Sequence, residues 1–182
     1  IDLDGTIGSG AAIGVDVLIG QSVLTSDVEL GGAITANGSV TVDGTTVAIA
    51  ANVSAEADSG TTGSVDIAGV TSVTQTTGTI NANAGSVKIA SSGAGSTVTV
   101  TDVDSSGNNT QATEITTNGT TDNTGVAIQI DAAGTATVGG IDATNAAGNV
   151  EITSVCLSQW ASPRLLQSGS MQRIHKAGPC RA

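Results

Sequence analysis

The sequence predicts an all-β fold, a parallel β-solenoid with about 20–25 residues per coil. A short phrase recurs in which a small residue precedes two aliphatic residues that flank one polar residue. In its four clearest copies the first valine is Val40, Val65, Val87 or Val150, so the steps are 25, 22 and 63 residues, and the last step is nearly three times 21. The chain contains no Phe or Tyr, which a broad globular core of this size normally requires. Val, Ile, Leu and Ala side chains instead fill a narrow tube.

Each copy of the phrase predicts a short strand with one face inward and one outward. The repeat is cleanest over residues 32–90, where a second phrase of Ile, a polar residue and Ala precedes a turn rich in Asn and Gly. One coil is therefore expected to hold two strands and their turns, with room for a third short strand. Strands are predicted at 38–42, 63–67, 85–89 and 148–152, with looser copies at 96–100, 125–128 and 134–138.

The alternation also predicts which side chains form the core. Their burial is expected to contribute about 1.5–3 kcal/mol for each large aliphatic residue. The inward positions are Ile34, Val40, Val42, Val47, Ile49, Val65, Ile67, Ile80, Val87, Ile89, Val98, Val100, Val126, Ile128, Ile130, Val150 and Ile152.

Residues 102–124 break the pattern and predict a polar loop that protrudes from one corner of the fold. Their Asp-x-Asp-x-Ser-Gly start matches the first half of a calcium loop, but the twelfth position is Thr113, where an EF-hand needs a bidentate Glu. An EF-hand is therefore excluded. A looser calcium site stays open as a hypothesis, and its oxygen ligands would come from Asp102, Asp104, Asn108 and Asp122.

Charge divides the chain near residue 155. Residues 1–155 carry all 16 acidic residues against one base, Lys88, a formal charge of −15. This balance argues against nucleic acid and anionic membrane surfaces as partners, because both require clustered Lys and Arg. No run of eighteen apolar residues exists, so no membrane span is expected. The chain starts without Met, which indicates a processed or excised piece of a longer protein.

Residues 156–182 differ from the rest and form the second predicted segment, a basic tail after a repeat domain at 1–155. The tail carries +4 and holds both cysteines, Cys156 and Cys180, which an exported chain could join in a disulfide. It is either a terminal cap for the solenoid or sequence of foreign origin, and the residues favour neither. Residues 165–167 are expected to begin a short helix.

The Ile-x-Ala, turn, Gly-Ser/Asn-Val-x-Ile phrase, repeated over most of 1–155, resembles the filamentous-haemagglutinin type of large secreted exoprotein and related bacterial surface adhesins. The resemblance implies a right-handed parallel β-helix at the cell surface or in the medium, with a structural or adhesive role. It carries no catalytic or cofactor-binding residues to this chain. The expected partners are other copies of the chain, which could add to an open end as a filament, or cell-surface and matrix ligands.

Enzyme activity is not expected. Asp2-Leu3-Asp4-Gly5-Thr6 resembles the first motif of haloacid-dehalogenase-type phosphatases, but the other groups of that site and its helix–strand alternation are missing. A polysaccharide lyase or hydrolase is disfavoured because aromatic residues and bases are scarce. Thr-x-Thr pairs at 97–101 and 135–137 are the pattern of ice-binding solenoid faces, and this reading remains an alternative, as does a calcium-stabilised ligand-binding module.

Overall fold

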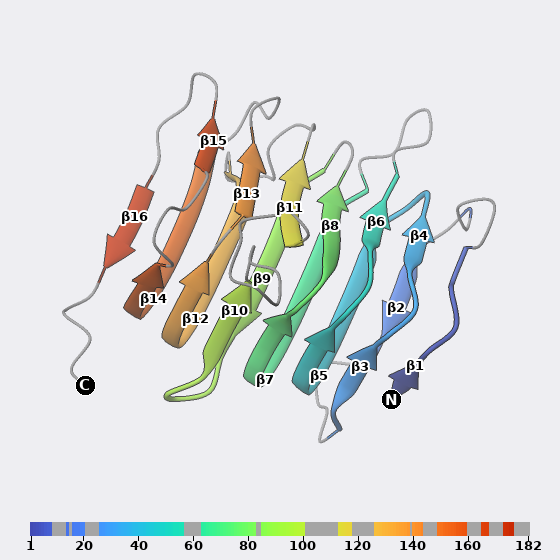
Figure 1. The fold of residues 1–182 in the computed structure, drawn as a ribbon, viewed down its shortest axis with the longest axis horizontal. Coiled ribbons are helices and arrows are strands. Elements are labelled where there is room, and N and C mark those ends of the chain that lie inside the picture. The colour runs from blue at the N-terminus through green and yellow to red at the C-terminus, as the bar shows by residue number, and fades with distance from the viewer. Residues whose placement is uncertain are drawn as a thin grey trace.

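A computed structural model shows two sheets of parallel strands stacked along the long axis of the molecule (Figure 1). It describes residues 1–8, 14, 16–20, 26–56, 63–82, 85–100, 113–117, 126–138, 140–143, 149–159, 165–167 and 173–176. Every strand pairing within these residues is parallel, and none of them is helical. The prediction of an all-β fold built from parallel strands is therefore confirmed.

The larger sheet contains two kinds of strand, short ones and long ones that bend in the middle. Its members are β1 (Asp2–Leu3), β2 (Val17–Ile19), β3 (Val28–Leu30), β5 (Val40–Ile49), β7 (Val65–Gln75), β9 (Val87–Ser91), β10 (Thr97–Val100), β12 (Val126–Val138), β14 (Asn149–Gln159) and β16 (Arg173–Lys176). The smaller sheet contains β4 (Ile34–Ala36), β6 (Val53–Ala55), β8 (Gly78–Ala82), β11 (Thr113–Thr117), β13 (Gly140–Ala143) and β15 (Leu165–Gln167).

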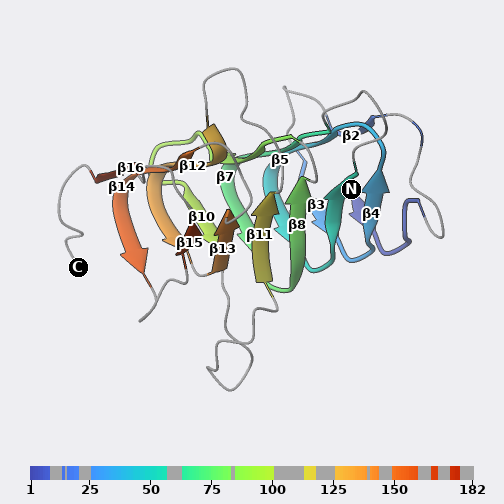
Figure 2. The same ribbon diagram turned by 90° about the horizontal axis from the view of Figure 1, so that it is seen from above.

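The bends divide the larger sheet into two rows of paired strands. The first row comprises β2, β9, β16 and the N-terminal halves of β5, β7, β12 and β14. The second row comprises β1, β3, β10 and the C-terminal halves of the same long strands. The smaller sheet is the third row. From β5 onward the chain visits the first, second and third rows in a constant order, and we call one such pass a rung (Figure 2).

The pairing register explains the sequence repeat. Val40, Val65, Val87, Ile128 and Val150 occupy one line across the first row, so the four clear copies of the phrase are equivalent, as their spacing predicts. The looser copies at 96–100 and 134–138 pair with each other in the second row instead. Their interpretation as further copies of the same strand was therefore wrong, because one Thr-aliphatic-Thr pattern suits the strands of both rows.

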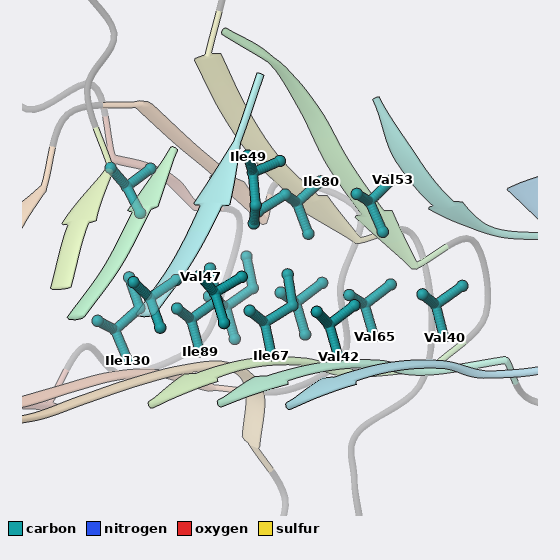
Figure 3. Close-up of a cluster of buried hydrophobic side chains, with 14 of the residues drawn as sticks. Val40, Val42, Val47, Ile49, Val53, Val65, Ile67, Ile80, Ile89 and Ile130 are labelled. Atoms are coloured by element: carbon teal, nitrogen blue, oxygen red, sulfur yellow. The ribbon is translucent and has the colours of Figure 1, made fainter. Parts of the chain in front are cut away.

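Aliphatic side chains from all three rows fill the space between the two sheets. Figure 3 shows Val40, Val42, Val65, Ile67, Ile89 and Ile130 in a line above one sheet, with Ile49, Val53 and Ile80 facing them. All seventeen residues predicted to point inward are buried. The core prediction is confirmed, because strict alternation leaves only one face of each strand able to hide its apolar side chains.

The turn that leads into the first row shows why Gly and Ser open the repeated phrase. A Cβ on Gly63 would lie 2.6 Å from the Gly38 carbonyl oxygen of the preceding rung, so no larger residue fits. The next residue, Ser64, donates its backbone N–H to Ser39 Oγ at 3.2 Å. Its own Oγ accepts the N–H of Ser86 at 3.1 Å. Close backbone stacking therefore requires the glycine, and the serine satisfies a backbone donor that the turn leaves without a strand partner.

Four strands of the larger sheet pair in a closed ring. β7 pairs with β10, β10 with β12, β12 with β9, and β9 with β7, so the connectivity of this part is that of a four-stranded parallel barrel. The ring closes because β7 and β12 are continuous, whereas the chain leaves the sheet between Ser91 and Thr97 and divides the intervening rung into β9 and β10.

The structure corrects two local predictions. The loop expected at 102–124 contains strand β11, in which Ile115 aligns with Ile80 and Ile141 in the third row. The helix expected to begin at 165–167 is strand β15, because pairing with β13 places these residues in the same row. In addition, β14 continues past residue 155 in register with β12, and Cys156 is disulfide-bonded. The other cysteine, Cys180, lies outside the described residues.

Candidate interaction surface

The calcium site proposed from the sequence lies outside the described residues, since Asp102, Asp104, Asn108 and Asp122 are all in undescribed stretches. Within the described part of the chain, no group of three or more His, Cys, Asp or Glu side chains converges as a metal site would require. The same residues contain no long apolar helix able to cross a lipid bilayer. The candidate surfaces are therefore the outer faces of the three rows.

The second row carries a regular array of hydroxyl groups on its outer face. Ser72, Thr97 and Thr135 align across β7, β10 and β12. Thr74, Thr99 and Thr137 align two residues further along the same strands. The residues between them, Val73, Val98 and Ala136, are buried, so the six hydroxyl-bearing side chains all point away from the core. We call these six residues the threonine face.

The geometry of parallel strands gives the threonine face a two-dimensional spacing. Neighbouring strands lie about 4.8 Å apart, and alternate residues of one strand lie about 6.6 Å apart. All six side chains are partly exposed, and within the described structure none of their hydroxyls is taken up by a hydrogen bond. The face is uncharged, and five of its six residues are threonines, whose β-branching limits rotation of the side chain. It therefore presents donors and acceptors in fixed, repeating positions.

The outer face of the first row is charged instead. Thr41, Asp66, Lys88, Gln129 and Glu151 occupy successive strands of one line. Burial raises the pKa of the Asp66 carboxyl above its ordinary value of 3.8, the adjacent Lys88 ammonium lowers it, and a second carboxylate nearby raises it again. The aligned Lys88 partly compensates the cost of burying this carboxyl. These side chains lie in a line across the strands and do not converge on one point, as the groups of a binding site would.

The outer face of the third row is polar, and its side chains bond to one another. Thr35, Ser54 and Asn81 align across β4, β6 and β8. Ser54 Oγ donates to Glu56 Oε1 at 2.7 Å, and Asn81 Nδ2 donates to Ser54 Oγ at 3.4 Å. Because these groups satisfy one another, the threonine face offers more unused hydrogen-bonding capacity to a ligand.

The sequence indicated only part of the threonine face. The Thr-x-Thr pairs of β10 and β12 are evident in the sequence, but Ser72 and Thr74 of β7 were missed because a serine replaces the first threonine. The three pairs also start 25 and 38 residues apart, at positions 72, 97 and 135, so they do not look periodic. Alignment of the strand pairs rather than of the repeats would have found them.

Comparison with protein-family models, with curated proteins and with solved structures finds no match to this chain. Its function is therefore argued from the geometry above.

Proposed function

We propose that the chain is a right-handed parallel β-solenoid that serves as a non-catalytic structural and adhesive segment of a secreted or cell-surface bacterial protein. The observation that carries the proposal is the constant register of all three rows, in which the chain returns to the same line of the first row at Val40, Val65 and Val87. Parallel strands joined by crossovers within one sheet are right-handed in almost all proteins, which supports the hand.

The closed ring of β7, β9, β10 and β12 is compatible with this architecture. In a solenoid whose strands bend at a corner, one rung can consist of two separate strands, one on each side of the corner. Each of these two strands then pairs with the continuous strand of the rung before it and with that of the rung after it. β9 pairs with β7 and β12 before the corner, and β10 pairs with the same two strands after it. The ring therefore needs no separate barrel in addition to the stacked rungs.

A stacked column of aliphatic side chains also suits a mechanical role. Each rung is held by backbone hydrogen bonds to its neighbours and by a core in which Ile67 and Ile89 are completely buried. Such a body is stiff, and its described strands offer proteases few unpaired segments. The adhesive part of the proposal rests on the threonine face, whose outward hydroxyls make no hydrogen bond within the part of the chain that the structure describes.

The proposal is tested by shape and by adhesion. Small-angle X-ray scattering of the purified chain should match the profile calculated from the stacked rungs, and a profile that the stacked rungs cannot fit would contradict the solenoid. Beads coated with the chain should bind immobilised collagen or fibronectin, whereas beads coated with a Thr99→Lys variant should bind less. A Thr41→Lys variant places the same charge on the outer face of the first row and is the matched control. Equal binding by all three proteins would refute the role of the threonine face.

Ice binding is a second candidate function, and the threonine face is the observation that favours it. The sequence showed two isolated Thr-x-Thr pairs, whereas the register places them side by side and adds the Ser-x-Thr of β7. A regular, uncharged array of hydroxyl and methyl groups can order water in two dimensions, which is what recognition of an ice surface requires.

The ice-binding candidate has a direct assay. Nanolitre osmometry should record a gap between the melting and freezing points of the wild-type solution. The Thr99→Lys variant should abolish the gap, and the Thr41→Lys variant should retain it. A wild-type chain without any gap at millimolar concentration would eliminate this function and leave the adhesive proposal standing.

A further inference from the structure

The edges that β1 and β2 form at one end of the molecule are unpaired among the described residues. β1 pairs only with β3, and β2 pairs only with β5. Val17 directs its N–H toward β5, where it donates to Ser39 O at 2.9 Å. Because successive residues of a strand direct their backbone groups to opposite sides, the N–H and C=O of Leu18 face away from β5. This end therefore presents backbone donors and acceptors to another strand.

Among the described strands, the opposite end presents one unpaired edge in each row. β16 ends the first row and pairs only with β14, and β15 ends the third row and pairs only with β13. In the second row the last strand is the C-terminal half of β14, which pairs with β12. Both ends of the molecule thus carry parallel strands of the same direction in all three rows.

The two ends are in phase with each other. The first described strands follow the order second row (β1), third row (the bridge at Ile7) and first row (β2). The opposite end finishes in the same order, with β14, β15 and β16. A second copy placed on this end would continue every row without a gap. Extending the register sets Ile7 of the second copy opposite Leu165 and Ile19 opposite Ile174.

Charge favours this contact between unlike ends over the two possible contacts between like ends. The acidic side chains of residues 1–30 are all exposed, and this stretch contains no Lys or Arg. The opposite end is basic, since β16 contains Arg173 and Lys176 and residues 156–182 contain no acid. Contact between two like ends would bring like charges together, whereas contact between unlike ends brings acids to bases.

We propose that two copies of this chain dock head to tail, with β1 and β2 of one copy adding to β14 and β16 of the next. The inference rests on the proposed solenoid and names its partner as a second copy of the chain. The contact joins two different surfaces and does not close on itself, so it propagates into a filament. The first row contains seven described strands, which sets an axial repeat of about 34 Å per copy.

Sedimentation of the purified 182-residue chain tests the contact. In low salt the chain should associate as its concentration rises, and electron micrographs should show filaments one molecule wide. At 1 M salt, where the Debye length falls to about 3 Å, the filaments should shorten or dissociate. A Leu18→Pro variant removes an edge N–H and should weaken association by about tenfold or more. Leu18→Ala keeps that N–H and should associate like the wild type.

Complementation separates head-to-tail docking from other modes. The Leu18→Pro chain keeps its basic end, and a chain with Arg173→Glu and Lys176→Glu keeps its acidic end. Neither should form filaments alone, but an equimolar mixture should form dimers that do not grow. Circular dichroism verifies that both variants are folded. If one variant is unfolded, the comparison of wild type in low and high salt still decides.

Different failures have different meanings. Particles whose scattering fits the stacked rungs but that stay monomeric in low salt at millimolar concentration would overturn the docking and leave the proposed solenoid intact. Association that Leu18→Pro and Leu18→Ala leave unchanged would also overturn it. A monomer whose solution scattering the stacked rungs cannot fit would refute the solenoid itself, and the docking would fail with it.

Discussion

Replacing Gly63 by Ala tests how closely the rungs stack. The added Cβ would lie 2.6 Å from the backbone oxygen of Gly38 and 3.2 Å from Ala55 Cβ. The first contact is with backbone, so one of two hydrogen-bonded rungs must shift. Overpacking of this kind costs about 1–3 kcal/mol. For a chain of this length, that predicts a fall in melting temperature of roughly 2–12 °C.

The assay is thermal unfolding followed by far-ultraviolet circular dichroism. Gly5→Ala is the control, because its Cβ would have no atom within 4 Å and Gly5 is exposed. Ala restricts the unfolded chain, so this control should melt at the wild-type temperature or slightly above it. If Gly63→Ala melts together with Gly5→Ala, the close approach of successive rungs is wrong, and the explanation of the Gly-Ser phrase is wrong with it.

Three further predictions concern the core, a charge and a turn. Ile67→Ala should destabilise the fold by about 2–5 kcal/mol in chemical denaturation, because it opens a cavity at a fully buried position. Leu18→Ala, at a side chain that is 60 % exposed, should change stability by about 0.5 kcal/mol or less. Asp66→Asn should raise the melting temperature at pH 7, because the folded state binds the Asp66 proton more tightly than the unfolded chain does. In the wild type, the stability gained from this tighter proton binding is complete below pH 3.8 and is lost as the pH rises through the higher pKa of the folded state. The melting temperature should therefore decline less between pH 3 and 7 for the variant than for the wild type. Equal slopes would contradict the raised pKa. Ser64→Ala should cost about 0.5–1.5 kcal/mol by removing the acceptor for the N–H of Ser86, and an unchanged midpoint in urea would show that this bond contributes nothing.

Strand alternation made the core predictable without a structure. In the stretch Val40-Thr41-Val42 only one face is apolar, so burial can be assigned before the partner strands are known. Gln75 could not be assigned in this way. It lies between Ile49 and Val100 in the second row and is fully buried, with Nε2 donating to the Gly78 carbonyl at 2.8 Å. A polar residue at the end of an apolar strand resembles an ordinary turn residue in the sequence.

The division into rows was less predictable, for a geometric reason. The step from Val87 to Ile128 is 41 residues, nearly twice the other steps, yet the two are direct neighbours in the first row. The extra residues occupy connections between β10, β11 and β12, and connections can vary in length without disturbing the register of the strands that they join. The spacing between copies of the repeated phrase therefore indicates where one rung ends and the next begins only where the connections are short.

The stacking of the turns that contain Gly63 and Ser64 has a consequence for how such a molecule changes length. The rungs that begin at Ser39, Ser64 and Ser86 meet through the same turn, the same serine bond and the same aliphatic line, so one of them is interchangeable with another. Removing residues 65–86 would bring Val87 opposite Val40, a match of valine to valine like the one it replaces. Duplication or loss of the residues of one such rung would therefore lengthen or shorten the body by one strand spacing while leaving both ends unaltered.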